Sequence, residues 1–233
     1  MNWFKSFLLA LLPEDSGVCV ICDRKIKGDF FVKSGHAGIC SDCADQLAFT
    51  RQGSSFPAVE PLSYLLCPFE YSGSIEKLLR SFKFGSNFKN GEILNILLRN
   101  FFEGYPHLRE FDCVIPVPLS AERLNERGYN QSEIIAHSIA EVIGIPLNTD
   151  TLVRIRHTER QSSLSAAERI MNVKNAFLSK RRMDHQRILL VDDIYTTGST
   201  MKNCAEALKD AGAAEIAGIA AATTIHPERP ILL

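Results

Sequence analysis

The sequence lacks the features that would place it in a membrane, in a fibrous protein or in a disordered class. It has no long hydrophobic run, because the apolar segment from Trp3 to Leu12 is too short to span a bilayer. That segment carries one lysine and no clear small-residue cleavage site, which favours a short amphipathic helix over a signal peptide. Internal repeats and low-complexity tracts are also absent. These absences predict a soluble, cytoplasmic protein without membrane insertion.

The chain also lacks a strong net charge. Its formal charge is −1 at pH 7, and 45% of its 233 residues are hydrophobic. A chain of this length and composition can bury one substantial α/β core and still carry a small appended module.

The most informative stretch that is present joins a strand, two acids and a turn within residues 188–200. Ile188 to Val191 is short, branched and apolar, as in a parallel strand buried on both faces. Asp192 and Asp193 follow at its carboxyl end. Ligands of open α/β sheets bind outside that end, so these acids are candidates for contact with a substrate.

A turn rich in hydroxyl groups follows the acids and leads into a helix that Gly212 ends. The turn consists of Thr196, Thr197, Gly198, Ser199 and Thr200. Free N–H groups and the helix dipole favour a phosphate there. The two acids would repel a phosphate, so we expect them to face ribose hydroxyls or a bridging Mg²⁺. The alternative is an ordinary Asp-Asp turn whose Ser and Thr only cap the helix.

These thirteen residues resemble the phosphoribosyl pyrophosphate (PRPP) binding motif of the type I phosphoribosyltransferases. The resemblance implies that Asp192 and Asp193 bind the ribose 2′ and 3′ hydroxyls. It also implies that residues 196–200 bind the 5′-phosphate.

Four cysteines form two C-x-x-C pairs, which is the spacing of a metal site. They are Cys19, Cys22, Cys40 and Cys43. Four thiolates complete the tetrahedral shell of a structural zinc ion, which would stabilise a module with little core of its own. His36 is a minor candidate to replace one of them, and disulfides are the alternative. The other cysteines, Cys67, Cys113 and Cys204, fit apolar strand or helix patterns and are expected in the core.

Residues 52–61 contain glycine, serine and two prolines without periodicity, as a linker does. We therefore expect an N-terminal helix and zinc-ribbon module over residues 1–60, and a transferase-like domain over residues 61–233. Lys and Arg balance Asp and Glu in residues 19–60, so the module alone gives no sign of DNA binding.

The transferase-like domain is expected to begin with a strand near residues 62–71 and two amphipathic helices near residues 75–82 and 93–101. A buried strand at residues 112–119 ends in prolines that force the chain out of the sheet. Lys83, between the two helices, is an anion-binding candidate, but a lysine flanked by phenylalanines more often lies along the edge of a core.

Two arginines follow that second strand, four residues apart. Arg123 and Arg127 precede Gly128, and Asn130 and Gln131 add donors before the next helix. Guanidinium groups suit the oxygens of pyrophosphate, the leaving group of a PRPP site. Ordinary surface pairs with Glu122 and Glu126 are the alternative.

Residues 154–187 form the basic part of the chain, with nine Lys or Arg against three Asp or Glu. The first half of this segment has no clear periodicity, so three interpretations stay open. The three interpretations are a loop that closes over a ligand, a set of phosphate contacts for a nucleic acid strand, and a solvated charged loop.

As a whole the chain resembles the ComF family, in which a double C-x-x-C zinc module precedes a phosphoribosyltransferase-like domain. The resemblance rests on the cysteine pairs and on residues 115–119 with 123–131, 161–172 and 190–200. It implies an association with DNA uptake and natural transformation, acting with single-stranded DNA. Only nine residues follow the last expected strand, residues 214–224, whereas base-salvaging transferases need further loops there.

Three functional classes follow. An enzyme would bind PRPP with Mg²⁺ and pass the ribosyl phosphate to an unknown acceptor. A binding module would hold PRPP as a ligand while the basic segment and the zinc ribbon engage single-stranded DNA or a helicase-like partner. A structural scaffold would not bind PRPP. The sequence fixes neither the acceptor nor the oligomeric state.

Overall fold

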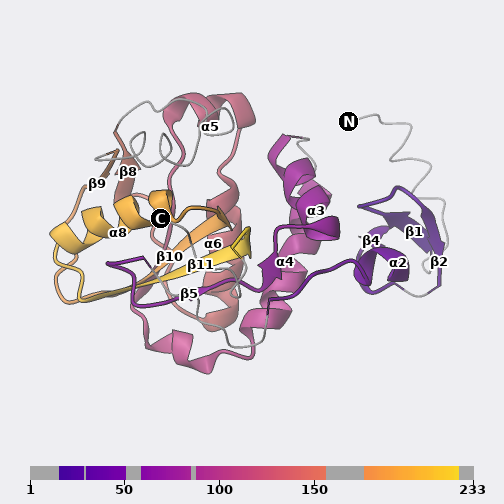
Figure 1. The fold of residues 1–233 in the computed structure, drawn as a ribbon, viewed down its shortest axis with the longest axis horizontal. Coiled ribbons are helices and arrows are strands. Elements are labelled where there is room, and N and C mark those ends of the chain that lie inside the picture. Colours follow the sequence, from indigo (N-terminus) through magenta and orange to yellow (C-terminus); the bar gives the residue numbers. More distant parts are fainter. Residues whose placement is uncertain (1–15, 29, 51–58, 85–87, 156–175, 226–233) are drawn as a thin grey trace. The chain divides into compact units, whose positions relative to one another are not determined.

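The computed structural model describes residues 16–28, 30–50, 59–84, 88–155 and 176–225 (Figure 1). The helix expected over residues 3–12, most of the linker and the expected loop over residues 156–169 lie outside them. The chain forms two compact units. The first combines the residues up to Ala48 with Ser72–Leu97, and the second combines Phe49–Tyr71 with the residues from Leu98 onward. The division predicted after residue 60 stays a prediction.

The first unit contains a small four-stranded sheet of order β2-β1-β4-β3. Its strands are β1 (Ser16–Cys19), β2 (Lys25–Lys27), β3 (Val32–Ser34) and β4 (Ala37–Ile39), and α2 (Ser41–Ala44) follows. The pair β1–β4 is parallel and the two outer pairs are antiparallel. A Cβ at Gly17 would lie 2.9 Å from the Phe30 ring, and one at Gly38 would also meet that ring. Only glycine lets the ring cover these two neighbouring strands.

The rest of the first unit consists of α3 (Gly73–Phe84) and most of α4 (Phe88–Phe102). Helix α3 buries Ile75, Leu78, Leu79 and Phe82, at the helical spacing seen in the sequence. A Cβ at Gly91 would lie 2.7 Å from the Phe82 ring, so the glycine allows α4 to approach α3 closely. The two helices predicted for this region are confirmed.

The second unit contains a five-stranded sheet in which every pairing is parallel. The strands are β5 (Leu65–Leu66), β6 (Phe69–Glu70), β7 (Cys113–Pro116), β10 (Arg187–Tyr195) and β11 (Glu215–Thr223). Their order is β5-β11-β10-β7, with β6 also beside β11. The predicted parallel sheet is confirmed, although the strand expected over residues 62–71 is two short strands separated by Cys67 and Pro68.

Helices flank this sheet, as predicted. Helix α8 (Ser199–Asp210) packs Met201, Cys204 and Leu208 against Ile188 and Leu190. Helix α6 (Gln131–Ile143) packs against β7 and β10 (Figure 1). The remaining elements are η1 (Pro106–Glu110), α5 (Ala121–Arg127) and the antiparallel pair of β8 (Leu152–Arg154) and β9 (Phe177–Ser179). Cys67, Cys113 and Cys204 are buried, as expected.

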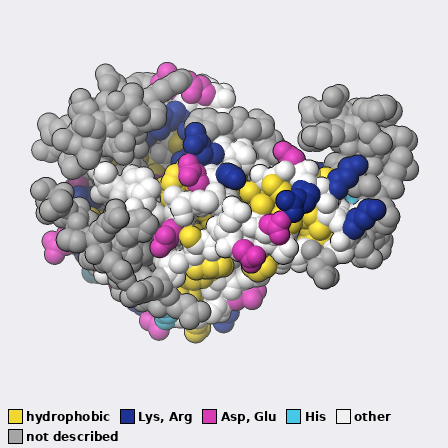
Figure 2. Space-filling model, turned by 45° about the vertical axis from the view of Figure 1, so that its right-hand side comes forward, with side chains coloured by type: hydrophobic (Ala, Val, Ile, Leu, Met, Phe, Trp, Pro, Cys, Tyr) yellow, Lys and Arg dark blue, Asp and Glu magenta, His cyan; other side chains and the backbone are white. Residues whose placement is uncertain are grey.

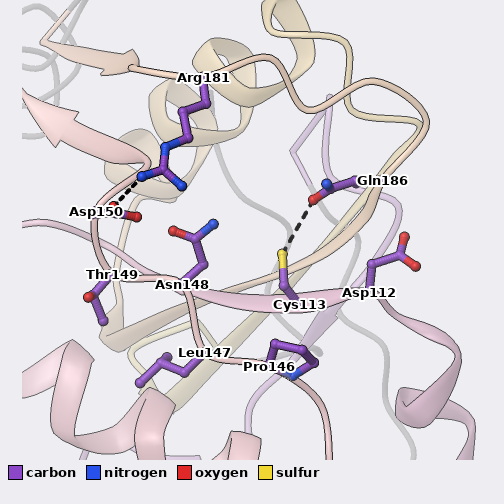
Figure 3. A pocket seen from close by; sticks show the side chains of 9 residues that line it. All are labelled: Asp112, Cys113, Pro146, Leu147, Asn148, Thr149, Asp150, Arg181 and Gln186. Carbon is purple, nitrogen blue, oxygen red and sulfur yellow. Dashed lines mark hydrogen bonds and ion pairs between the residues drawn. The ribbon is translucent and has the colours of Figure 1, made fainter.

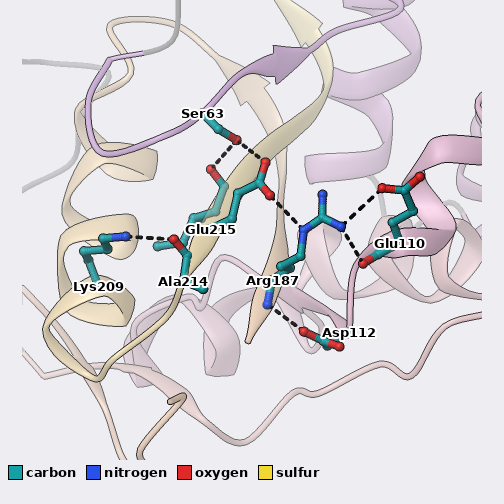
Figure 4. A network of polar contacts seen from close by, with 8 residues as sticks. Ser63, Glu110, Asp112, Arg187, Lys209, Ala214 and Glu215 are labelled. Atoms are coloured by element: carbon teal, nitrogen blue, oxygen red, sulfur yellow. Dashed lines mark hydrogen bonds and ion pairs between the residues drawn. The ribbon is translucent and has the colours of Figure 1, made fainter. Parts of the chain in front are cut away.

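An arginine ties together the strand starts at the amino-terminal edge of the sheet (Figure 4). The Arg187 backbone N–H donates to Asp112 Oδ2 at 2.7 Å, just before β7. Its side-chain Nε donates to Glu215 Oε2 at 2.8 Å, and Nη1 donates to the Glu110 carbonyl at 3.1 Å. The guanidinium also lies over the Phe111 ring, 4.8 Å from its centroid. Arg187 therefore fixes the starts of β7, β10 and β11 relative to one another through both its backbone and its side chain.

The Phe30 ring gives a prediction for the first unit. We expect Gly38→Ala to lower the free energy of unfolding by about 1–3 kcal/mol, because the new Cβ must displace the ring or Val32 O, which lies 2.5 Å away. Chemical denaturation of the intact protein measures this, with exposed Lys27→Ala as the control. Equal stability of Gly38→Ala and the wild type would contradict the close packing.

Candidate functional site

The four predicted metal ligands lie together in the first unit. Cys19 ends β1, Cys22 follows in the next turn, Cys40 comes directly after β4 and Cys43 lies in α2. Each pair spans a tight turn, since Asp23 N–H donates to Cys19 O and Ala44 N–H to Cys40 O, both at 2.9 Å. The four Sγ atoms all lie within 4.8 Å of one another.

This geometry fits a zinc ion. Four thiolates at about 2.3 Å from a tetrahedral ion are roughly 3.8 Å apart, and the Sγ atoms of Cys22 and Cys40 are 3.8 Å apart. None of the seven cysteines, all of which lie in the described part of the chain, forms a disulfide. His36 Nδ1 lies 3.2 Å from Ser16 O and is not part of the cysteine cluster.

The thiols affect one another's ionisation. Burial, followed by the neighbouring cysteines, raises the pKa of Cys43. Burial also opposes ionisation of Cys19, but backbone N–H groups of Cys40, Cys22 and Ile21 donate to its sulfur and lower its pKa to about 7. Four thiolates in this space repel one another, and a dication removes that repulsion.

The cluster predicts one zinc ion per chain. We expect Cys22→Ser to abolish stoichiometric zinc, and because Cys22 is exposed, its loss costs little packing. Elemental analysis of purified protein measures the metal. Cys113→Ala removes a thiol outside the cluster and should leave the zinc content unchanged. Full zinc content in Cys22→Ser would contradict four-cysteine ligation.

The two predicted ribose-binding acids lie at the end of β10, in the second unit. Asp193 is buried, with 8% exposure. The Oδ1 atom of Asp192 accepts a hydrogen bond from the Ser132 hydroxyl at 2.9 Å and another from the Asp193 backbone N–H at 2.8 Å. Two donors therefore fix the orientation of the Asp192 carboxylate.

Ser132 was not among the residues predicted from sequence. It lies in the first turn of α6, where the Asn130 side chain accepts from its backbone N–H at 3.2 Å. Asn130 Nδ2 also donates to Val117 O at 3.0 Å, directly after β7. The start of α6 is thus bonded to the chain after β7 and to the end of β10. The sequence identified Asn130 only as a further donor, and it gave no signal for the hydrogen bond between Ser132 and Asp192, which are 60 residues apart.

The predicted phosphate turn follows the acids, and α8 begins within it at Ser199. Gly198 has φ +75°, and a Cβ there would lie 2.8 Å from Tyr195 Cζ. The Thr197 and Ser199 hydroxyls are 2.7 Å apart. Helix α8 has 12 residues, and its first N–H groups favour an anion. Thr196, Thr197 and Thr200 are half-buried around this helix start.

The two predicted pyrophosphate-binding arginines lie on α5, between β7 and α6. The Ser120 hydroxyl accepts from Arg123 N–H at 3.3 Å, and Gly128 ends the helix with φ +77°. Arg127 Nη1 donates to Gln131 Oε1 at 2.9 Å, which links it to the first residue of α6.

A third arginine, Arg154, belongs to the same surroundings. It is half-buried at the end of β8, and its guanidinium lies 5.5 Å from the centroid of the Phe177 ring. Burial lowers the pKa of Arg154, and the nearby charge of Arg123 lowers it further, while Cys204 and Asp192 oppose the shift. The sequence placed Arg154 only in a general basic segment. The residues from Arg156 to Asn175, including that segment's motif, lie outside the described residues.

Lys83 lies in α3, in the first unit, whereas the two acids and the three arginines lie in the second unit. Among the described residues, no helix is both long and apolar enough to cross a membrane.

Comparison with known proteins finds a matching domain family and several similar proteins. Residues 130–231 match the family model of the phosphoribosyl transferase domain. Competence protein F of Haemophilus influenzae is 30% identical over 86% of this chain and 88% of its own length. Competence protein ComFC of Bacillus subtilis is 30% identical over 88% of this chain and 83% of its own length. The DNA utilization protein YhgH of Escherichia coli K12 is 27% identical over 86% of this chain and 87% of its own length.

Among solved structures, the adenine phosphoribosyltransferase of Leishmania tarentolae is similar over 72% of this chain and 94% of its own, with a TM-score of 0.37 and 15% identity.

Proposed function

This chain belongs to the ComF family of competence proteins, and on that premise we propose that its second unit binds PRPP and transfers the ribosyl phosphate. The observation that carries the proposal is the Asp192 carboxylate, held by Ser132 and Asp193 directly before a hydroxyl-rich helix start. Acids beside a phosphate cradle match a sugar phosphate, because they accept from sugar hydroxyls while the helix start binds the phosphate.

In this proposal Asp192 and Asp193 accept hydrogen bonds from the ribose 2′ and 3′ hydroxyls. The Ser132 hydroxyl donates a hydrogen bond to Asp192 Oδ1, so the carboxylate is already oriented before the ligand binds. The 5′-phosphate lies against Thr196, Thr197, Gly198, Ser199 and Thr200. Gly198 keeps the turn narrow there, since a Cβ at this position would clash with the Tyr195 ring.

The pyrophosphate of PRPP lies toward α5, against Arg127 and Arg123. Guanidinium groups bind phosphate oxygens through paired N–H donors. Mg²⁺ bound with PRPP would supply further positive charge, and the carboxylate oxygens of Asp192 and Asp193 are ligands of the kind it prefers. Arg154 adds positive charge near Asp192.

The proposed reaction is a substitution at the ribose anomeric carbon. The bond from this carbon to the pyrophosphate oxygen breaks, and pyrophosphate leaves with the electron pair. The acceptor then forms its bond to the same carbon. The arginines stabilise the negative charge that develops on pyrophosphate, which is where fixed cations contribute most to such a reaction.

The acidic pair gives the first test. We expect the Asp192→Ala, Asp193→Ala double variant to bind PRPP with Mg²⁺ at least about tenfold more weakly than the wild type, because both hydroxyl acceptors are lost. Isothermal titration measures this affinity. Asp210→Asn, at the far end of α8, serves as a control that should bind normally. Unchanged affinity in the double variant would contradict the assignment.

Ser132 gives a second test, of positioning. We expect Ser132→Ala to weaken PRPP binding by about 1 kcal/mol, the typical net value of one hydrogen bond, and Ser132→Thr to restore much of it. Binding of pyrophosphate alone should not change, since Ser132 acts through the ribose acid. Equal losses for PRPP and pyrophosphate would indicate a general structural effect instead.

A second candidate function is single-stranded DNA binding, and the surface of the first unit favours it. Phe31 is 55% exposed, and Lys33 Nζ lies 5.1 Å from the centroid of the neighbouring Phe30 ring. Exposed rings among cations are the usual platform for stacking bases beside a charged backbone. In the second unit, Arg181 pairs with Asp150 and Arg182 with Asp184. Figure 2 shows Lys and Arg interspersed with Asp and Glu over the described part of one face.

Salt dependence tests this second function. If the surface around Phe31 binds single strands, Phe31→Ala should weaken affinity for an oligo-dT strand while leaving the salt slope unchanged. Lys33→Ala should reduce that slope by roughly one unit at most. Arg181→Ala with Arg182→Ala tests the basic segment in the same way. Affinity that does not depend on salt in the wild type would rule out phosphate contacts.

A further inference from the structure

A pocket of about 450 Å³ lies at the amino-terminal edge of the parallel sheet (Figure 3). It is formed by the start of β7, by the segment after α6 and by two residues of the connection between β9 and β10, Arg181 and Gln186. Asp192 and the phosphate turn lie at the other end of β10. The two sites are therefore separate, and no part of the proposed transfer reaction uses this pocket.

The backbone around the pocket is fixed by hydrogen bonds. Val114 N–H donates to Pro146 O at 2.8 Å, and Asn148 N–H donates to Val114 O at 2.9 Å, so the segment after α6 continues the sheet beside β7. On the other side, Asp112 accepts from the Arg187 backbone N–H. Arg187 in turn is held by Glu215 and Glu110, as Figure 4 shows. The walls are in place before any ligand binds.

Two side-chain amides extend into this pocket from opposite sides (Figure 3). The Asn148 oxygen accepts from Thr151 N–H at 3.2 Å, and because a backbone N–H can only donate, the oxygen's position is fixed. The Asn148 NH₂ group then points the other way. The pocket thus gains an oriented pair of N–H donors from Asn148.

Gln186 is oriented in a similar manner. The Cys113 thiol donates to its side-chain oxygen, with 3.7 Å between sulfur and oxygen. Burial raises the pKa of Cys113 to about 11, and Asp112 contributes to the increase, so this thiol keeps its proton at neutral pH and remains a donor. The Gln186 NH₂ group is consequently the end available to a ligand. Both amides present donors to the same space.

The charges around the pocket do not favour an anion as its ligand. Arg181 Nη2 and Asp150 Oδ2 form an ion pair at 2.6 Å, which neutralises that part of the rim. Asp112 adds one further negative charge. A phosphate would meet this carboxylate, whereas an uncharged ligand with carbonyl oxygens for the amides and an N–H for Asp112 meets matching groups. Leu147 and Pro146 supply an apolar wall for a planar ring.

We propose that this pocket binds a nucleobase that carries carbonyl and N–H groups side by side, as uracil and thymine do. The base comes either from a free nucleoside or from a single strand, and the chemistry of recognition is the same in both cases. The proposal does not depend on PRPP binding at the other end of the sheet.

Isosteric variants test it without disturbing the fold. Asn148→Asp keeps the oxygen that accepts from Thr151, and Gln186→Glu keeps the oxygen that accepts from Cys113, but each change removes the NH₂ donors. We expect the wild type to bind thymidine and uridine in a titration followed by protein NMR, with adenosine binding more weakly because it has no base carbonyl. The double variant should bind thymidine about tenfold or more weakly than the wild type.

Three controls make the result decisive. Asn100→Asp makes the same chemical change at an exposed position of α4 and should bind thymidine normally. Asp192→Ala should also bind it normally. Thermal unfolding of the double variant verifies that it is folded, and its PRPP affinity should match the wild type. Comparing the affinities for oligo-dT and for thymidine at equal base concentration shows whether the base comes from a strand or from a free nucleoside. A site for a single strand binds the oligonucleotide more tightly, whereas a site for a nucleoside does not.

The proposal is overturned if no nucleoside shifts the resonances of residues around the pocket, which would leave only water there. It is also overturned if the double variant binds thymidine as tightly as the wild type. Loss of thymidine binding in Asp192→Ala would place the base at the carboxyl edge of the sheet instead.

Discussion

The hydrogen bond from the Ser132 hydroxyl to Asp192 Oδ1, 2.9 Å long, is the constraint on which the arrangement of the site depends. It joins the start of α6 to the end of β10. The same helix start is bonded through Asn130 to the chain after β7 and through Gln131 to Arg127. The start of α6 therefore contacts both Asp192, which is proposed to bind the ribose, and Arg127, which is proposed to bind pyrophosphate.

The central strand β10 connects two chemically different edges. Its first residue, Arg187, organises three strand starts through charged hydrogen bonds, and its last part supplies the acidic pair. Between them Ile188 to Val191 are fully buried. Such a strand lacks freedom to slip in register, because a shift of one residue would place a charged side chain in the core. The fixed register holds the carboxylates at one edge and the pocket of Asn148 and Gln186 at the other.

Much of this was predictable from the sequence, because the informative signals were local. The apolar run before Asp192, the turn before α8 and the two C-x-x-C pairs each encode their chemistry within a few residues. The roles of Ser132 and Arg154 were not predictable, because their contacts with β10 and α5 depend on tertiary packing between distant segments. The strand expected over residues 62–71 divides in two at Pro68, which has no N–H to donate to a neighbouring strand. The pocket likewise depends on three segments that are distant in sequence.

The central claim is that the carboxyl edge of β10 is a PRPP site. The most direct measurement is a crystal structure of the whole chain with PRPP and Mg²⁺. We expect the ribose hydroxyls within hydrogen-bonding distance of Asp192 and Asp193, the 5′-phosphate at residues 196–200 and the pyrophosphate toward Arg127. Electron density for the ligand at any other place, or an empty strand edge at saturating PRPP, would contradict the account.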